Sequence, residues 1–322
     1  MDPLDHAEPK PAVVSQSCPA VMTAAPDARP THGMAPPGDR LPDTTQLGRV
    51  RLQIANLDRS LRFYEEILGL RVLDRADPRA TLGAQNDSAP LVELVEQPGT
   101  QPVPPRGRLG LFHVAFRVPT RTALGRFLRH LADRDVEPGT SDHRVSEAIY
   151  LTDPDGLGIE VYADRPRSRW TYDTDGQLEM TTDPLDVRSL VEAAGASSWT
   201  GAPAGTDVGH VHLHVGDLDR AAAFYHEALG LDETVWKYPG ALFLSAGGYH
   251  HHLGTNVWAG DVPPPRDRDA QLLEWTLLVP TRDDVDAAAG RLDAAGYTVT
   301  RTDDACLVSD PWGTPLRIAP GP

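Results

Sequence analysis

The chain has 322 residues and an apolar fraction of 40%, which is enough for about two globular domains. Its 30 basic and 46 acidic side chains give a formal net charge of −16, which argues against electrostatic binding of nucleic acid or of an anionic membrane. No apolar run approaches the roughly 18 residues of a transmembrane helix, so we expect no membrane span.

Residues 1–45 are rich in proline, alanine and polar residues and show no helical or strand periodicity. They also lack the basic start and the apolar block of a signal peptide. We therefore expect a disordered N-terminal tail. Of the two cysteines, Cys18 lies in this tail and Cys306 near the other end, and neither has a metal-ligand spacing. This favours a reduced, cytoplasmic protein.

Two short motifs recur along the chain at one fixed distance. The segment Asn56–Leu70 returns as Asp217–Leu231, and Val118–Arg121 returns as Val279–Arg282. The offset is 161 residues in both cases, from 56 to 217 and from 118 to 279. Because two unrelated motifs share one offset, the sequence predicts a duplicated domain.

Each half divides again into two units, in which a strand leads into an amphipathic helix and then into further short strands. The prediction is an α+β fold of four βαβββ modules, two in a first domain over residues 46–163 and two in a second domain over residues 208–320. Residues 164–207 are rich in polar residues, glycine and proline, and are expected to form a linker with one short helix near 185–194.

The first helix of each half has recognisable start and stop signals. Asn56 or Asp58 can cap the helix of module one, and Asp217 or Asp219 can cap that of module three. Gly69 follows the last apolar position of the first helix and is expected to end it.

The end of module two contains a histidine, a tyrosine and a carboxylate at fixed spacings: His143, Tyr150 and Glu160. An Asp-Pro-Asp-Gly turn lies between the last two, which predicts two strands, over residues 148–151 and 158–162. Side chains alternate faces along a strand, so Glu160 points away from its apolar neighbours. A carboxylate in such a strand needs a partner, and a metal ion is one.

The repeat allows equivalent positions to be compared within one chain. The third residues of the opening strands are related by steps of 64 and 161 residues, and the ends of modules two and four provide one further residue each. These positions are Arg49, His113, His210, Glu274, Glu160 and Arg317.

His113, Glu160 and His210, all from the two inner modules, form the two-histidine, one-carboxylate ligand set that is typical of non-heme Fe(II) centres. The sequence therefore predicts that module two pairs with module three around a metal. Two arginines and a glutamate cannot hold such a metal. We expect module one to pair with module four around an ion pair in place of the lost site.

With these residues considered together, the region 46–320 resembles the vicinal oxygen chelate superfamily, and within it the two-domain extradiol dioxygenases of the catechol 2,3-dioxygenase type. The segment from His143 to Glu160 is similar to the signature of that family. The resemblance implies that His210, His113 and Glu160 are the three metal ligands, and that the metal is Fe(II), with Mn(II) as the alternative. It also implies a small aromatic diol and O₂ as substrates.

The histidine-rich segment Gly247–Gly254 resembles a paired-histidine strand of the same family, and His251 matches its acid–base catalyst. His143 and Tyr150 match the residues that contact the catechol oxygens. By strand alternation, His250 and His252 are expected to face the other side, in solvent or behind the site. One of the histidines at 212 and 214 is expected to line the cavity, and three aromatic residues are candidates for its wall: Trp236, Tyr238 and Trp258.

Two alternatives remain open. A glyoxalase-type lyase or isomerase usually requires four ligands, and an antibiotic-sequestering protein requires no metal. The sequence does not specify the substituents on the ring, proximal or distal cleavage, the choice between iron and manganese, or the oligomeric state, for which a homo-oligomer is one option.

Overall fold

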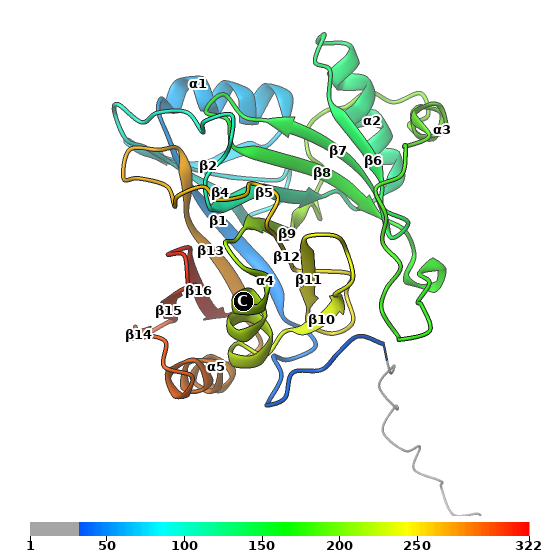
Figure 1. The fold of residues 1–322 in the computed structure, drawn as a ribbon. Coiled ribbons are helices and arrows are strands. Elements are labelled where there is room, and N and C mark those ends of the chain that lie inside the picture. The colour runs from blue at the N-terminus through cyan, green and yellow to red at the C-terminus, as the bar shows by residue number, and fades with distance from the viewer. Residues whose placement is uncertain (1–31, 322) are drawn as a thin grey trace, which may run out of the picture. The chain divides into compact units, whose positions relative to one another are not determined.

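The computed structural model describes residues 32–321, whose strands form two curled eight-stranded sheets (Figure 1). The strand order is β14-β15-β16-β13-β1-β4-β3-β2 in the first sheet and β10-β11-β12-β9-β5-β8-β7-β6 in the second. We name them the outer sheet and the inner sheet, after the predicted outer and inner modules. The outer sheet contains β1 (Gln46–Ile54), β2 (Arg71–Ala76), β3 (Arg79–Gly83), β4 (Pro90–Glu96), β13 (Gln271–Val279), β14 (Thr300–Arg301), β15 (Cys306–Ser309) and β16 (Pro315–Pro320). The inner sheet contains β5 (Gly110–Arg117), β6 (Gly139–Asp142), β7 (Ser146–Thr152), β8 (Gly158–Asp164), β9 (Asp207–His214), β10 (Asp232–Val235), β11 (Ala241–Ser245) and β12 (Leu253–Asn256).

Each sheet joins the two halves of the chain through one antiparallel strand pair. β5 lies beside β9 in the inner sheet, and β1 lies beside β13 in the outer sheet. Within each module the first and last strands run parallel, as β5 does with β8 and β9 with β12. The predicted α+β fold of four βαβββ modules is confirmed. The predicted pairing of module two with module three, and of module one with module four, is confirmed as well.

The predicted helix boundaries are also confirmed, and the structure decides between the candidate caps. The side chains of Asn56 and Asp217 accept a backbone N–H from the residue three positions later, so these two are the N-caps. Gly69 has a φ of +73°, which suits the residue that ends a helix. The helical segments are α1 (Leu57–Arg62), η1 (Phe63–Ile67), α2 (Arg121–Ala132), η2 (Arg167–Arg169), α3 (Val187–Ala193), α4 (Leu218–Ala222), η3 (Ala223–Ala228) and α5 (Arg282–Ala294).

The two Asp-Pro-x-Gly turns are held in the same way in both halves. The carboxylates of Asp153 and Asp310 each accept backbone N–H groups from two and four residues later, at 2.8–2.9 Å. A buried tyrosine hydroxyl donates to each carboxylate, Tyr64 to Asp153 at 3.4 Å and Tyr225 to Asp310 at 2.9 Å. Because both halves share this arrangement, the turn and the duplicated Phe-Tyr motif serve the fold rather than a site in one half.

The segment that precedes β1 packs against the second half of the chain. Met34 forms an isolated antiparallel bridge with Glu233, and Leu41 is 2% exposed and donates its N–H to the carbonyl of Gly230. The expectation of disorder is therefore wrong for residues 32–45, because their backbone groups and Leu41 find partners that composition does not reveal. The rest of the predicted tail, residues 1–31, lies outside the described residues.

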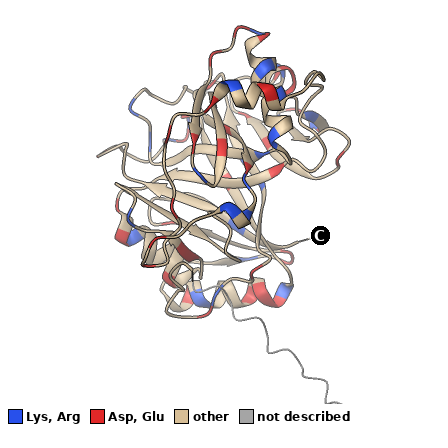
Figure 2. Ribbon diagram, turned by 90° about the vertical axis from the view of Figure 1, so that its right-hand side faces the viewer, with Lys and Arg blue, Asp and Glu red and all other residues tan. Residues whose placement is uncertain are grey.

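Acidic and basic residues are interspersed along the ribbon of the described residues (Figure 2). Many form ion pairs, such as Arg121 with Glu147 and Arg165 with Asp142, both at 2.5 Å. Within residues 32–321, no helix has the length and apolar character that crossing a membrane would require.

Candidate metal centre

The three predicted metal ligands come together at the centre of the inner sheet. His113 lies on β5, Glu160 on β8 and His210 on β9, and these strands are neighbours in the sheet. Nε2 of His113 is 3.0 Å from Oε2 of Glu160 and 3.3 Å from Nε2 of His210. The third side of the triangle, from Nε2 of His210 to Oε2 of Glu160, is 3.2 Å. The side chains are buried, and no other cluster of this kind occurs in residues 32–321.

This triangle fits a divalent transition metal. Adjacent ligand atoms of a six-coordinate metal with bonds of roughly 2.1 Å lie about 3.0 Å apart. The observed separations of 3.0–3.3 Å are close to that value. Two imidazole nitrogens and one carboxylate oxygen on one side of the metal are the ligand set of non-heme Fe(II) and related Mn(II) sites. The residues present thus fit the metal that the sequence predicts.

The charge states of the cluster also suit a metal. Burial opposes the charged form of Glu160, but the adjacent imidazoles of His210 and His113 outweigh it and hold the pKa of this carboxyl well below its usual range. Burial lowers the pKa of His210 to about 4, against the opposing effect of Glu160. A carboxylate and a neutral imidazole at neutral pH are the forms that bind a metal.

A cavity of about 240 Å³ opens directly over the three ligand atoms. It lies below the roughly 300–1,000 Å³ typical of pockets for drug-sized ligands, so it suits a compact molecule. The linker that joins the two halves forms part of its wall, which the sequence did not indicate. Besides the three ligands, the lining residues are Phe112, His143, Tyr150, Met180, Thr181, Thr182, His212, Tyr238, Phe243, His251 and Trp258.

The cavity wall contains most of the residues that were predicted for it. His212 lines this cavity, whereas His214 lines a neighbouring open groove, so the structure selects the first of the two. Tyr238 and Trp258 form part of the aromatic wall, but Trp236 does not. The sequence missed two aromatic lining residues, Phe112 and Phe243, because apolar strand positions give no local sign of whether they face a core or a cavity.

His143 and Tyr150 form a hydrogen-bonded pair in this wall. Nδ1 of His143 lies 2.6 Å from the carbonyl oxygen of Thr181, which can only accept, so this nitrogen carries the hydrogen. Nε2 of His143 therefore accepts the hydroxyl hydrogen of Tyr150, at 2.6 Å. Burial, together with the charge of Glu160, raises the pKa of Tyr150 well above its usual range and keeps it protonated.

His251 lies against the candidate ligand His210, with ring centroids 4.1 Å apart. Its Nδ1 is hydrogen-bonded to Nδ1 of His250, at 2.7 Å. Its Nε2 has no hydrogen-bond partner among the described residues, and the residue faces the cavity. Burial, followed by the nearby imidazoles, lowers the pKa of His251 well below its usual range, so that the ring is neutral at rest.

Of the two alternatives for His250 and His252, solvent or a place behind the site, the structure excludes solvent. Their exposed fractions are 0% and 8%, and they lie in the loop before β12 rather than in a regular strand. Strand alternation therefore does not apply to them. His250 bridges His251 and Asp164, and Nδ1 of His252 accepts the N–H of Ala246 at 3.2 Å.

A family model described as the Glyoxalase/Bleomycin resistance protein/Dioxygenase superfamily matches residues 46–161 and 207–313. The chain belongs to this superfamily. Over 272 residues it is 44% identical to a protein of Bacillus subtilis (strain 168) named catechol-2,3-dioxygenase, which covers 84% of this chain and 95% of that protein. The predicted resemblance is thus confirmed.

Solved structures of other proteins share the fold. A protein of Bacillus subtilis described as a candidate dioxygenase matches with a TM-score of 0.60 at 16% identity, covering 88% of this chain and 87% of that one. Glyoxalase I from Zea mays matches with a TM-score of 0.51 at 17% identity, covering 86% and 92%. At these identities the likeness is one of fold.

Strand pairing identifies the equivalent position on the last strand of every module. In each module, one residue of the last strand pairs with the same position of the first strand. The pairs are Arg51 with Glu93, Ala115 with Glu160, His212 with Gly254 and Thr276 with Arg317. Glu93 was not predicted as an equivalent position from the sequence, although it lies 161 residues before Gly254. Like Glu160, it lies between two apolar residues. The inner sheet of this superfamily member thus has three candidate ligands and a glycine in the fourth position.

Arg49 and Arg317 of the outer sheet both form ion pairs, but not with Glu274. Arg49 pairs with Glu93 at 3.0 Å, and Arg317 pairs with Asp304 at 2.5 Å. Glu274 has no ion pair among the described residues. The prediction of a pair among Arg49, Glu274 and Arg317 is therefore wrong, because Glu93 on the adjacent strand neutralises Arg49.

The absence of a side chain on Gly254 leaves room for the imidazole of His212. A Cβ atom on Gly254 would lie 2.9–3.0 Å from three ring atoms of His212, closer than packed carbon atoms approach. The space that a fourth ligand would need is thus filled by the imidazole of His212. Its Nε2 is buried without a partner among the described residues.

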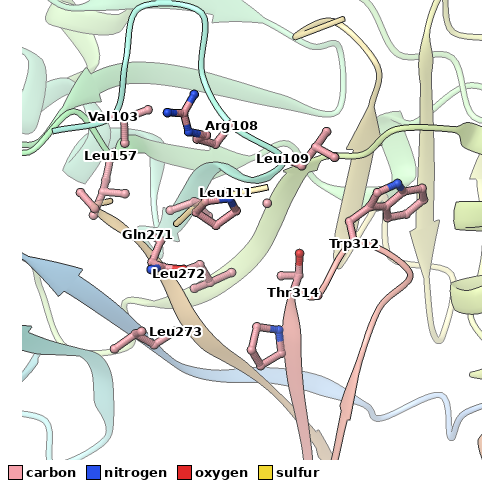
Figure 3. A pocket seen from close by; sticks show the side chains of 15 residues that line it. Val103, Arg108, Leu109, Leu111, Leu157, Gln271, Leu272, Leu273, Trp312 and Thr314 are labelled. Carbon is pink, nitrogen blue, oxygen red and sulfur yellow. The ribbon is translucent and has the colours of Figure 1, made fainter. Parts of the chain in front are cut away.

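A second, smaller cavity of about 110 Å³ lies between residues of both sheets (Figure 3). Its wall includes Leu109, Leu157, Leu272 and Trp312, with Arg108, Gln271 and Thr314 as polar residues. None of the side chains that line it is His, Cys, Asp or Glu. This cavity therefore has no group that could bind a metal or transfer a proton at neutral pH.

Gly209 on β9 is expected to be intolerant of a side chain. A Cβ atom there would lie 1.8 Å from the hydroxyl oxygen of Tyr162, which is fixed by a 2.6 Å hydrogen bond to Tyr249. We expect Gly209→Ala to destabilise the protein by about 1–3 kcal/mol, measured by urea unfolding. Gly290, exposed on α5 with open space around it, is the control: Gly290→Ala should stabilise the fold by about 0.5–1 kcal/mol. Equal effects of the two substitutions would contradict the packing assigned to Gly209.

Proposed function

We propose that this protein is an Fe(II)-dependent extradiol dioxygenase that opens the ring of a catechol-like aromatic by inserting O₂ next to the vicinal diol. One observation carries the proposal: a three-membered ligand set opens into a compact aromatic cavity that also holds His251, His143 and Tyr150. The similarity to the catechol-2,3-dioxygenase of Bacillus subtilis supports a ring-cleaving oxidoreductase.

His113, Glu160 and His210 would hold the metal, which lowers the cost of deprotonating a bound diol and supplies the electrons that activate O₂. Two neutral imidazoles and one carboxylate carry a charge of −1, so a divalent cation held by them would keep one positive charge for the anionic oxygen of the substrate. The rest of the chemistry falls to the side chains around the cavity.

His251 would act as the general base and acid. His251 lines the cavity, and its Nε2, which has no partner among the described residues, can take the proton of a catechol hydroxyl and later return it. The hydroxyl of Tyr150 and the ring of His143 would orient a substrate oxygen by hydrogen bonding. Phe112, Phe243 and the other aromatic residues would hold the ring and exclude water.

The structure favours this function over both alternatives. Gly254 in the fourth position argues against a four-ligand glyoxalase-type centre. Three buried polar side chains that converge without a metal would be costly to fold, which argues against a simple binding protein.

Oxygen consumption tests the proposal. Protein loaded anaerobically with Fe(II) or, in parallel, with Mn(II) is mixed with catechols that carry different substituents, and O₂ uptake is followed together with visible absorbance. We expect one O₂ per catechol and a yellow ring-opened product with one metal, and no turnover after chelation. Absence of O₂ uptake with every catechol and both metals would refute the proposal, as would undiminished activity in metal-free protein.

A further inference from the structure

A continuous chain of hydrogen bonds leads from His251 away from the cavity. Nδ1 of His251 is 2.7 Å from Nδ1 of His250, and Nε2 of His250 is 2.9 Å from Oδ1 of Asp164. The two imidazoles are 5% and 0% exposed. These hydrogen bonds therefore connect His251 in the cavity wall directly with the carboxylate of Asp164, which lies behind that wall.

The direction of these hydrogen bonds follows from what each group can donate. A carboxylate only accepts, so Nε2 of His250 carries the hydrogen. The other nitrogen of a neutral imidazole is an acceptor, so the hydrogen between the two rings belongs to Nδ1 of His251. Nε2 of His251 then carries the lone pair, and this is the nitrogen that has no partner among residues 32–321, on a side chain that lines the cavity.

Asp164 is itself held in place by two further donors. Its Oδ1 also accepts the hydroxyl hydrogen of Tyr249 at 3.2 Å, and its Oδ2 accepts from Nη1 of Arg117 at 3.1 Å. Asp164 lies four residues after Glu160 on β8, so alternation places both carboxylates on the same face of the strand. The strand β8 thus provides both the proposed metal ligand Glu160 and Asp164, the carboxylate at the far end of the hydrogen-bond chain.

We propose that Asp164 and His250 are positioning residues for His251: they hold its ring orientation and keep it as the Nδ1–H tautomer, so that Nε2 is the basic atom at the substrate. A carboxylate that orients a histidine through hydrogen bonding is a known way to fix which ring nitrogen reacts. Here a second histidine lies between the two. The inference rests on the proposed function in taking His251 as the base, but the tautomer itself is a property of the protein alone.

The first measurement concerns the tautomer and does not depend on turnover. In full-length protein labelled with ¹⁵N-histidine, NMR distinguishes protonated from unprotonated ring nitrogens, and a His251→Asn sample assigns the resonances of His251. We expect the Nδ1–H form in the wild type and its loss in Asp164→Asn. An Nε2–H form in the wild type would overturn the proposal, even if the enzyme cleaves catechols.

The second measurement concerns catalysis by the iron-loaded protein. We expect Asp164→Asn to lower kcat roughly ten- to a hundredfold, with KM and iron content unchanged. Tyr249→Phe is the matched control, because it removes another donor to the same oxygen of Asp164 and leaves the two histidines in place; its kcat should stay within about threefold of the wild type. An unchanged kcat in Asp164→Asn, or equal losses in the two variants, would overturn the proposal.

His250→Phe provides an independent variant if Asp164→Asn does not fold. It keeps a planar ring between Trp170 and Tyr249 but removes the partner of His251 Nδ1. The same fall in kcat at unchanged KM is expected, and an unchanged kcat contradicts the proposal. If the wild type consumes no O₂ with any catechol, the proposed function fails, and the NMR result still decides whether the tautomer is held as inferred.

Discussion

Glu160→Ala protein is expected to retain less than about a tenth of the wild-type metal and to lose ring cleavage. The carboxylate of Glu160 is the only negatively charged group in the ligand triangle, and its Oε2 lies 3.0–3.2 Å from both imidazoles. Since removing even a residue that only supports a ligand costs roughly ten- to a hundredfold in metal affinity, removing a ligand should cost at least as much. Metal content by mass spectrometry after gel filtration measures the effect, with His113→Ala as a second variant.

The outer sheet provides a matched control for Glu160. Glu93 occupies the equivalent position on β4 and is likewise buried, but it pairs with Arg49 and Arg51 at 3.0 and 3.3 Å. Glu93→Ala should therefore keep the wild-type metal content, whatever it costs in stability. Unchanged metal content in both Glu160→Ala and His113→Ala would refute the proposed centre.

His251→Asn is expected to lower kcat roughly 10²- to 10⁴-fold, the usual contribution of a general acid–base group. The substitution removes the proposed base of the cavity wall but leaves the three proposed ligands, so metal content should not change. Anaerobic titration with a catechol should still give the absorbance change of the bound diol. Stopped-flow absorbance and O₂ uptake measure the two effects separately.

His252→Asn is the control for His251. The two histidines are adjacent in sequence, but the ring of His252 is turned toward Ser245 and Ala246 and does not line the cavity. We expect its kcat to stay within a few-fold of the wild type once folding has been checked by circular dichroism. A loss of the same size in both variants would show that the effect of His251→Asn is structural.

Sequence reasoning located the three proposed ligands because the chain contains its own comparison. The four modules share one register, so equivalent strand positions can be compared directly. The inner modules have His113, Glu160 and His210 at positions where the outer modules have residues such as Arg49 and Arg317. The same comparison showed that the Asp-Pro-x-Gly turn occurs in both halves and belongs to the fold, whereas His143, Tyr150 and Glu160 occur in one half only. The helix caps and the glycine that ends the first helix were predictable for a local reason, because their hydrogen bonds close within four residues.

The same reasoning was wrong where it assumed regular structure beyond its local signals. His250 and His252 were placed by strand alternation, but that segment is a loop whose histidines are buried. Glu93 was overlooked because its equivalence to Glu160 appears in the pairing of strands rather than in a shared turn motif. The linker seemed to be a spacer, yet Met180, Thr181 and Thr182 line the cavity.

The sequence by itself determined the duplicated α+β fold, the pairing of inner with inner and outer with outer modules, and the identity of the candidate ligands, since these depend on strand period and on a repeat of 161 residues. Only the tertiary structure decided how the site is completed. The hydrogen bond between Asp164 and His250 joins positions 86 residues apart, and the wall of the cavity combines the linker with strands of both halves. Such contacts depend on how loops fold over the sheet, and no local pattern encodes them. Glu160 and His251 are therefore predictable as candidate reactive groups, whereas the hydrogen bonds that join His251, His250 and Asp164 are not.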